Sequence, residues 1–133
     1  MKQKRSIVLG LIAGMLLLVI ACSFSTANIS EAFLAREVND VLEKTTTFGQ
    51  DEVINCAVIL KNAPDGTVTK ASWYAVDAEG LDPNSLILES EYDKILPVIV
   101  FTLSFEDLSP VGTYRVDLSI NDKIKETLEF EIQ

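Results

Sequence analysis

The chain has 133 residues, of which 11 are basic and 20 are acidic, so its formal net charge is −9. Nucleic-acid binding needs a basic surface that meets the phosphates, and this excess of negative charge argues against it. The sequence contains no histidine, which excludes Ser-His-Asp and Cys-His catalytic arrangements and most zinc sites. We therefore expect no nucleic-acid partner and no cofactor.

The first 22 residues have the layout of a secretory signal peptide. A basic head, Lys2 to Arg5, precedes an apolar run from Ile7 to Ile20. This run of 14 residues is shorter than the roughly 20 that a helix needs to cross a bilayer. It ends in Val19-Ile20-Ala21-Cys22. These four residues resemble the lipobox of bacterial lipoprotein signal peptides, which has an aliphatic residue, a tolerated position, a small residue and a cysteine.

The resemblance implies that the chain is cut after Ala21 and that the sulfur of Cys22 carries a diacylglycerol. It divides the chain into a cleavable signal helix (1–21), the lipidated cysteine with a short tether (22–28) and a domain (29–133). The protein would then be attached to the cell membrane through the lipid on Cys22 and face outside the cytoplasm. A plain signal peptide cut near Ala27 and an uncut single-span anchor are the alternatives.

Cleavage after Ala21 would leave 112 residues with 8 basic and 20 acidic side chains, a net charge of −12. This length suits one domain with a substantial core. The charge predicts repulsion from an anionic lipid surface and favours a cationic protein partner.

The rest of the chain alternates between apolar and polar residues, in segments separated by turn residues. The expected strands are residues 29–38, 53–60, 67–77, 86–89, 98–105, 114–120 and 124–132. Residues 31–37 also fit two helical turns, and residues 41–50 fit a loop or a short strand. Asn121-Asp122 predicts a tight hairpin, after which Ile124, Leu128, Phe130 and Ile132 should point inward, with Glu126 interrupting that row.

About seven short strands at this spacing predict an all-β, antiparallel β-sandwich. Three features resemble the immunoglobulin-like fold: Trp73 on the third strand, Cys56 on the second, and Tyr114 within Pro110-Val-Gly-Thr-Tyr-Arg-Val116. The resemblance implies that Trp73 is the buried core tryptophan and that Tyr114 forms a tyrosine corner. Because Val116 stands where the family has its second cysteine, the inter-sheet disulfide is absent and Cys56 should pack against Val116. This fold hosts many functions and names no activity.

Two acidic stretches are candidate cation sites. Asp77, Glu79 and Asp82 surround Gly80 and supply oxygen ligands that Ca²⁺ uses, although their spacing is not that of an EF-hand. A solvated acidic loop is the alternative for this stretch. Glu89, Glu91 and Asp93 would share one face of an extended strand, where repelling charges indicate a guarded edge rather than a metal site.

Two aromatic residues are candidate contacts for a partner. Tyr74 points away from Trp73 on the same expected strand, and Phe48 lies in the polar stretch before the second strand. An exposed aromatic side chain is typical of protein interfaces. For each, ordinary packing within the domain is the alternative.

Three functions are consistent with these features. We favour a lipid-anchored, extracytoplasmic binding or interaction module of unknown ligand that is not an enzyme. The alternatives are a structural or stress-related envelope lipoprotein without a dedicated ligand, and a small hydrolase that uses a pair of carboxylates. A cleft with two close, buried carboxylates would support the hydrolase.

Overall fold

The computed structural model describes residues 26–133 of the chain, and the predicted signal peptide and Cys22 lie outside this range. The described strands are β1 (Asn28–Val38), β2 (Val41–Lys44), β3 (Thr47–Phe48), β4 (Ile54–Lys61), β5 (Thr69–Ala78), β6 (Ser85–Tyr92), β7 (Ile99–Leu103), β8 (Gly112–Ile120) and β9 (Lys123–Ile132). No helix within residues 26–133 is long and apolar enough to cross a membrane.

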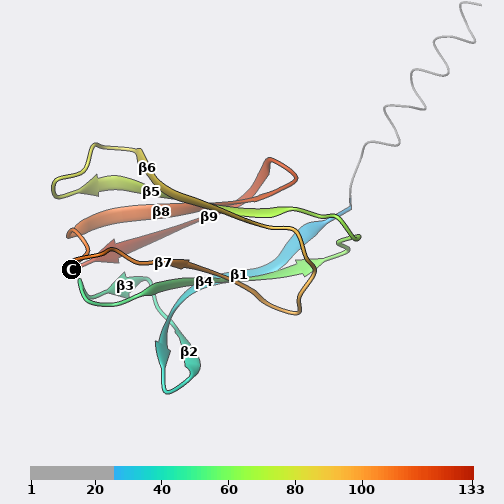
Figure 1. The fold of residues 1–133 in the computed structure, drawn as a ribbon, viewed down its shortest axis with the longest axis horizontal. Helices are drawn as coiled ribbons and strands as arrows, with labels where there is room; N and C mark the ends of the chain where they lie inside the picture. Colours follow the sequence, from blue (N-terminus) through green and yellow to red (C-terminus); the bar gives the residue numbers. More distant parts are fainter. Residues whose placement is uncertain (1–25) are drawn as a thin grey trace, which may run out of the picture.

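The strands form two sheets that lie face to face (Figure 1). One sheet has four strands in the order β2-β1-β4-β7, and the other has five in the order β3-β9-β8-β5-β6. Neighbouring strands are antiparallel, except that β3 runs parallel to β9. The predicted all-β sandwich is confirmed for this part of the chain.

The seven long strands lie close to the predicted ones, and β1 settles the ambiguity between strand and helix. β1 pairs with β4 over most of its length, so its amide groups bond across strands instead of within a helical turn. The stretch predicted as a loop or a short strand contains both β2, which forms a hairpin with β1, and β3, which joins the five-stranded sheet.

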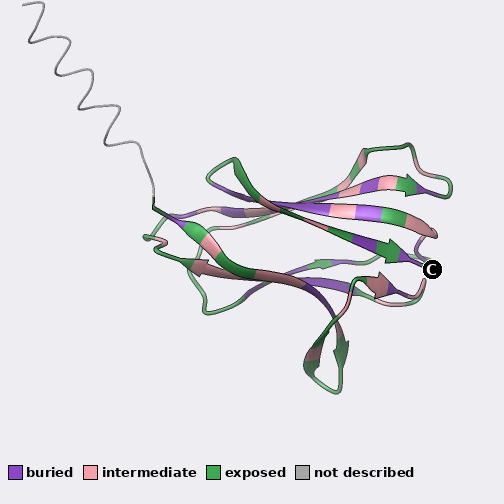
Figure 2. Ribbon diagram, turned by 180° about the vertical axis from the view of Figure 1, so that it is seen from behind, coloured by how far each residue is buried: buried purple, intermediate pink, exposed green. Residues whose placement is uncertain are grey.

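Apolar side chains from both sheets form one buried core, and buried residues recur along the long strands of both sheets (Figure 2). Trp73 is completely buried, as predicted, and its ring meets Phe130 edge-on at 5.9 Å between centroids. Tyr114 stacks on the same Phe130 ring at 5.3 Å. Its hydroxyl donates a hydrogen bond to the Pro110 carbonyl oxygen, which confirms the predicted tyrosine corner. Cys56 is a free thiol in this core.

The β8–β9 hairpin turns at Asn121 and Asp122, whose φ angles of 49° and 65° suit the expected tight turn. A bulge follows: Leu118 pairs with Glu126 while Ser119 pairs with Ile124. The extra residue shifts the side-chain alternation by one position. The prediction that Ile124 points inward is therefore wrong, because this side chain is 62% exposed.

Candidate functional site

Phe48 is not an exposed contact, and that prediction is corrected by the structure. The side chain is 1% exposed and meets Phe130 edge-on at 5.8 Å. The parallel pairing of β3 with β9 places Phe48 opposite Ile132 and turns its ring into the core. A short strand in a polar stretch thus contributes one of the largest buried side chains.

Tyr74 lies on the outer face of the five-stranded sheet, as predicted, and is half-buried. The Arg115 guanidinium lies 4.2 Å from the centre of its ring, in cation–π geometry. Arg115 also pairs with Asp117 at 3.5 Å. One face of the Tyr74 ring is therefore already occupied by a neighbouring side chain.

The structure does not bring the calcium candidates together. Asp77 is at the end of β5, and Glu79 and Asp82 follow it in the turn, all three exposed. Nowhere in residues 26–133 do three side chains of His, Cys, Asp or Glu gather closely enough to hold a metal ion. A solvated acidic loop describes this stretch.

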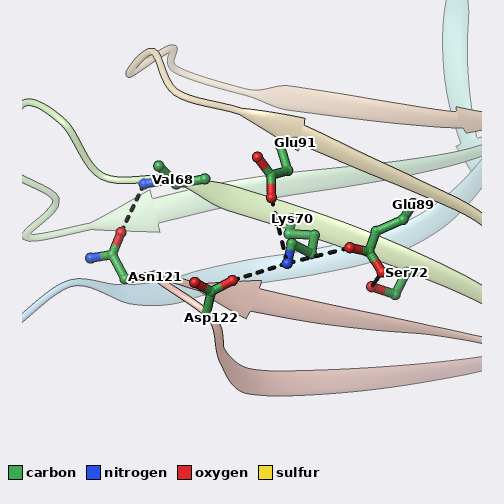
Figure 3. Close-up of polar contacts among 7 residues, drawn as sticks. All are labelled: Val68, Lys70, Ser72, Glu89, Glu91, Asn121 and Asp122. Carbon is green, nitrogen blue, oxygen red and sulfur yellow. Dashed lines mark hydrogen bonds and ion pairs between the residues drawn. The ribbon is translucent and has the colours of Figure 1, made fainter.

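Glu89 and Glu91 share a face, but they share it with a lysine. Lys70 Nζ lies 2.9 Å from Asp122, 3.4 Å from Glu89 and 3.5 Å from Glu91, as Figure 3 shows. Its hydrogen bond to Asp122, together with that to Glu89, raises the pKa of Lys70 above its usual range. These ion pairs join β5 to β6 and to the β8–β9 turn. The acidic side chains of β6 therefore take part in packing on the outer face of the sheet.

The carboxylate pair that a hydrolase would need is not formed in the described residues. Asp117 is the one buried carboxylate there, at 9% exposure. It accepts a hydrogen bond from the Thr127 hydroxyl and pairs with Arg115. These contacts satisfy its charge on the outer face of the sheet and leave no second buried acid beside it.

A feature that the sequence analysis missed is a groove of about 320 Å³ between β6 and β7. Its lining includes Ser90 and Tyr92 from β6, Leu96 from the connection, and Val100, Phe101 and Thr102 from β7. These two strands are the last members of their sheets on the same side of the sandwich. The groove is therefore the mouth of the inter-sheet space on that side.

Apolar side chains gather around this groove without being buried. Leu96 and Val100, which line it, are 43% and 46% exposed, and Leu88, Ile95 and Val98, which are close in sequence on β6 and in the β6–β7 connection, are 39% to 42% exposed. Leu88 pairs with Trp73 across the β5–β6 ladder and so points to the inner face. It stays 39% exposed because the four-stranded sheet ends at β7, and no further described strand covers it.

The sequence shows that the residues of this surface are apolar, but it does not show that they are exposed. Ile99, Phe101 and Leu103 of β7 are buried, while the exposed positions are Val100 and Thr102, preceded by Val98, so apolar residues occur on both faces at this strand. That pattern suits a strand in the middle of a sheet. In β7 it occurs on an edge strand, where it leaves apolar surface open to contact.

Comparison with known proteins supports the fold and goes no further. No protein-family model matches the chain, and no curated protein matches it. An immunoglobulin-like protein from Pseudomonas aeruginosa superimposes with a TM-score of 0.59 at 11% identity, over 84% of this chain and 99% of that one. A β-glucosidase from Listeria innocua gives a TM-score of 0.49 at 18% identity, over 77% of this chain and only 16% of the enzyme. The described residues thus form an immunoglobulin-like β-sandwich.

Proposed function

We propose that this chain is a lipid-anchored, extracytoplasmic binding module, and that the β6–β7 groove is its contact surface. The observation that carries the proposal is the group of half-exposed apolar side chains around that groove. Contiguous apolar surface bordered by polar residues is typical of sites that bind other proteins. The immunoglobulin-like fold fits such a role, since its function resides in surfaces placed on a rigid scaffold.

The chemistry of the chain supports a role in binding rather than catalysis. The sequence has no histidine, and the described residues contain no buried pair of carboxylates and no cluster that could hold a metal. The acidic charge favours a cationic partner, because opposite charges speed the encounter.

The test is co-purification of the full, tagged chain from its native membranes in detergent, at about 50 mM and about 500 mM salt. The control carries residues 1–28 of this chain fused to an unrelated β-sandwich, so that any anchor is the same. We expect one partner in near-stoichiometric amount with this chain and not with the control. Its recovery should fall at high salt, where charge attraction is screened. Equal recovery with both proteins would contradict a binding function.

A further inference from the structure

β7 is an edge strand whose free side borders the groove. It pairs with β4 through all five of its residues, and no other strand in the described range pairs with it. Alternate N–H and C=O groups of such a strand point away from the sheet, where an added chain can bond to them. The edge is not masked by charged or proline residues, because the strand reads Ile-Val-Phe-Thr-Leu.

A strand added beside β7 would also cover apolar side chains that are now open. Its side chains on one face would lie toward the inter-sheet mouth, which is lined by Ser90 and Tyr92 from β6 and by Leu96. The other face would continue the outer surface beside Val100. Since side chains alternate along a strand, the segment that fits has an apolar residue at every second position.

The charge of the segment that supplies the lining of the groove selects among the occupants of this edge. From Ser85 to Leu108 the chain has five acidic residues and one basic residue, Lys94. Lys70 pairs with two of the acids, but no salt bridge within the described residues reaches Asp93, Glu106 or Asp107. A second copy of this chain would bring the same acidic segment and repel. A basic segment would be attracted.

We infer that β7 binds an extended, basic segment of a partner protein as an added antiparallel or parallel strand, with apolar residues inserted at the groove. This inference rests on the proposed function and specifies its partner: a chain in which Val or Ile alternates with Lys or Thr. The backbone supplies the strand pairing, the groove selects the apolar positions, and the acidic segment 85–108 selects the charge.

The probe is a labelled ten-residue peptide with blocked ends, in which Val alternates with Lys and Thr, added to the full chain in detergent. A twin peptide has Glu in place of each Lys. Anisotropy should show binding of the basic peptide and at least tenfold weaker binding of the acidic one. Amide hydrogen exchange should slow at residues 99–103. Equal binding of the two peptides would overturn the charge assignment.

Two substitutions locate the site, and both place a lysine on an edge strand of the same sheet. Val100→Lys puts a positive charge beside β7, where the side chain is 46% exposed. Val41→Lys does the same on β2, at the opposite edge, where the side chain is 64% exposed. The first should weaken binding of the basic peptide at least tenfold and the second less than twofold. Unchanged Trp73 emission shows that both variants are folded.

Two N-methylated peptides distinguish backbone strand pairing from binding through apolar side chains alone. One is methylated at each Val and the other at each intervening residue, so each loses the N–H groups along one edge. Strand pairing requires that one peptide loses binding and the other keeps it, whereas equal binding of both would overturn the inference.

Two further outcomes would also overturn it, and one of them leaves the proposed function intact. A dimer of the full chain that Val100→Lys abolishes, without peptide binding, would make a second copy the occupant. A membrane partner recovered equally with wild type and Val100→Lys would remove this site while the binding function stands. Failure to recover any partner contradicts the proposed function itself.

Discussion

Tyr114 joins the start of β8 to the chain just before it through its hydroxyl group. The ring is 1% exposed and stacks on Phe130, and the hydroxyl donates to the Pro110 carbonyl oxygen. Tyr114→Phe keeps the ring but leaves that carbonyl without its partner. We expect a loss of about 1–2 kcal/mol in the free energy of unfolding. Urea unfolding followed by Trp73 emission measures it.

The matched control is Tyr74→Phe. Tyr74 is also a sheet tyrosine, but its hydroxyl has no hydrogen bond to another described residue, and its ring faces Arg115. Removing the Tyr74 hydroxyl should lower the free energy of unfolding by less than about 0.5 kcal/mol, as for most surface changes. Equal costs for the two variants would contradict the role given to the tyrosine corner.

Because Cys56 is a buried thiol, we expect the free energy of unfolding to fall at alkaline pH. Burial, and secondarily the negative charge of Glu126, raises the pKa of this thiol from 9.0 to about 12. Above pH 9 the unfolded chain releases the thiol proton while the folded chain keeps it. The contribution of the protonated thiol to the free energy of unfolding is therefore complete below pH 9 and is lost as the pH approaches 12. At about 1.4 kcal/mol per pH unit, the loss between pH 8 and 11 is about 2–3 kcal/mol.

Cys56→Ala removes this titrating group, while Tyr114, whose pKa burial also raises, stays in both proteins. The variant should therefore show a smaller decrease in unfolding free energy between pH 8 and 11, whatever its cost at pH 7. Urea titrations at each pH give the comparison. Parallel pH profiles for the two proteins would show that the thiol does not carry the effect.

The residues that sequence placed correctly are those fixed by a local pattern. Trp73 lies on a strand whose period-two alternation separates the inner from the outer face, Cys56 lies in a run that is apolar at nearly every position, and both are fully buried. Phe48 could not be placed in this way, because its burial depends on pairing with the distant strand β9. Cys56 and Val116 belong to the same core, as the immunoglobulin-like resemblance implied.

At the scale of elements, Gly112 of β8 leaves no room for a side chain beside β5. A Cβ on this residue would lie 2.5 Å from the Ala78 Cα and closer still to the Asp77 carbonyl oxygen. Both are backbone atoms of β5, so the strands themselves would have to separate. We expect Gly112→Ala to cost about 3 kcal/mol or more, at the upper end of what overpacking causes, as measured by urea unfolding.

Gly80→Ala is the control for backbone conformation. Gly80 has a φ of +75°, and no atom lies within 4 Å of the position that a Cβ would take. Its substitution should cost only the strain of a left-handed residue, about 1–2 kcal/mol. If Gly112→Ala costs no more than this control, the close approach of β5 and β8 is not what requires glycine.

The positions of strands were more predictable than their pairing. Apolar periodicity located the seven long strands, but a bulge between β8 and β9 reversed Ile124, while Glu126 keeps its place in the inward row and is half-buried. The inserted residue, Lys125, looks like any other polar residue of a strand. A bulge is visible only in the register between strands, and a single sequence does not contain that register.

At the scale of the whole molecule, the contact surface arises from the way the two sheets end. β6 and β7 finish their sheets on the same side, and the chain passes directly between them over residues 93–98. Leu88 and Val100 are apolar for reasons that would suit any interior strand, and only the sheet order makes them exposed. The groove therefore could not be predicted from local patterns.

Attachment to the membrane is the prediction that concerns the chain as a whole. If the chain is cut after Ala21, its net charge of −12 would repel anionic lipids, so we expect the acyl chains on Cys22 to provide the attachment. Each buried methylene contributes about 0.8 kcal/mol, and two chains hold a protein durably. We expect the protein to remain in native membranes after a wash with about 1 M salt. Its intact mass should correspond to a chain that starts at Cys22 and carries a diacylglycerol.

Cys22→Ser removes the sulfur that the lipid requires, whereas Cys56→Ala leaves it in place and is the matched control. The first variant should lose the lipid mass and leave the membrane fraction or keep its signal peptide, while the second should match the wild type in mass and location. A wild-type species of full length, or one cut later without lipid, would contradict the anchor. The fold and the β6–β7 groove would be unaffected, because they rest on residues 26–133 alone.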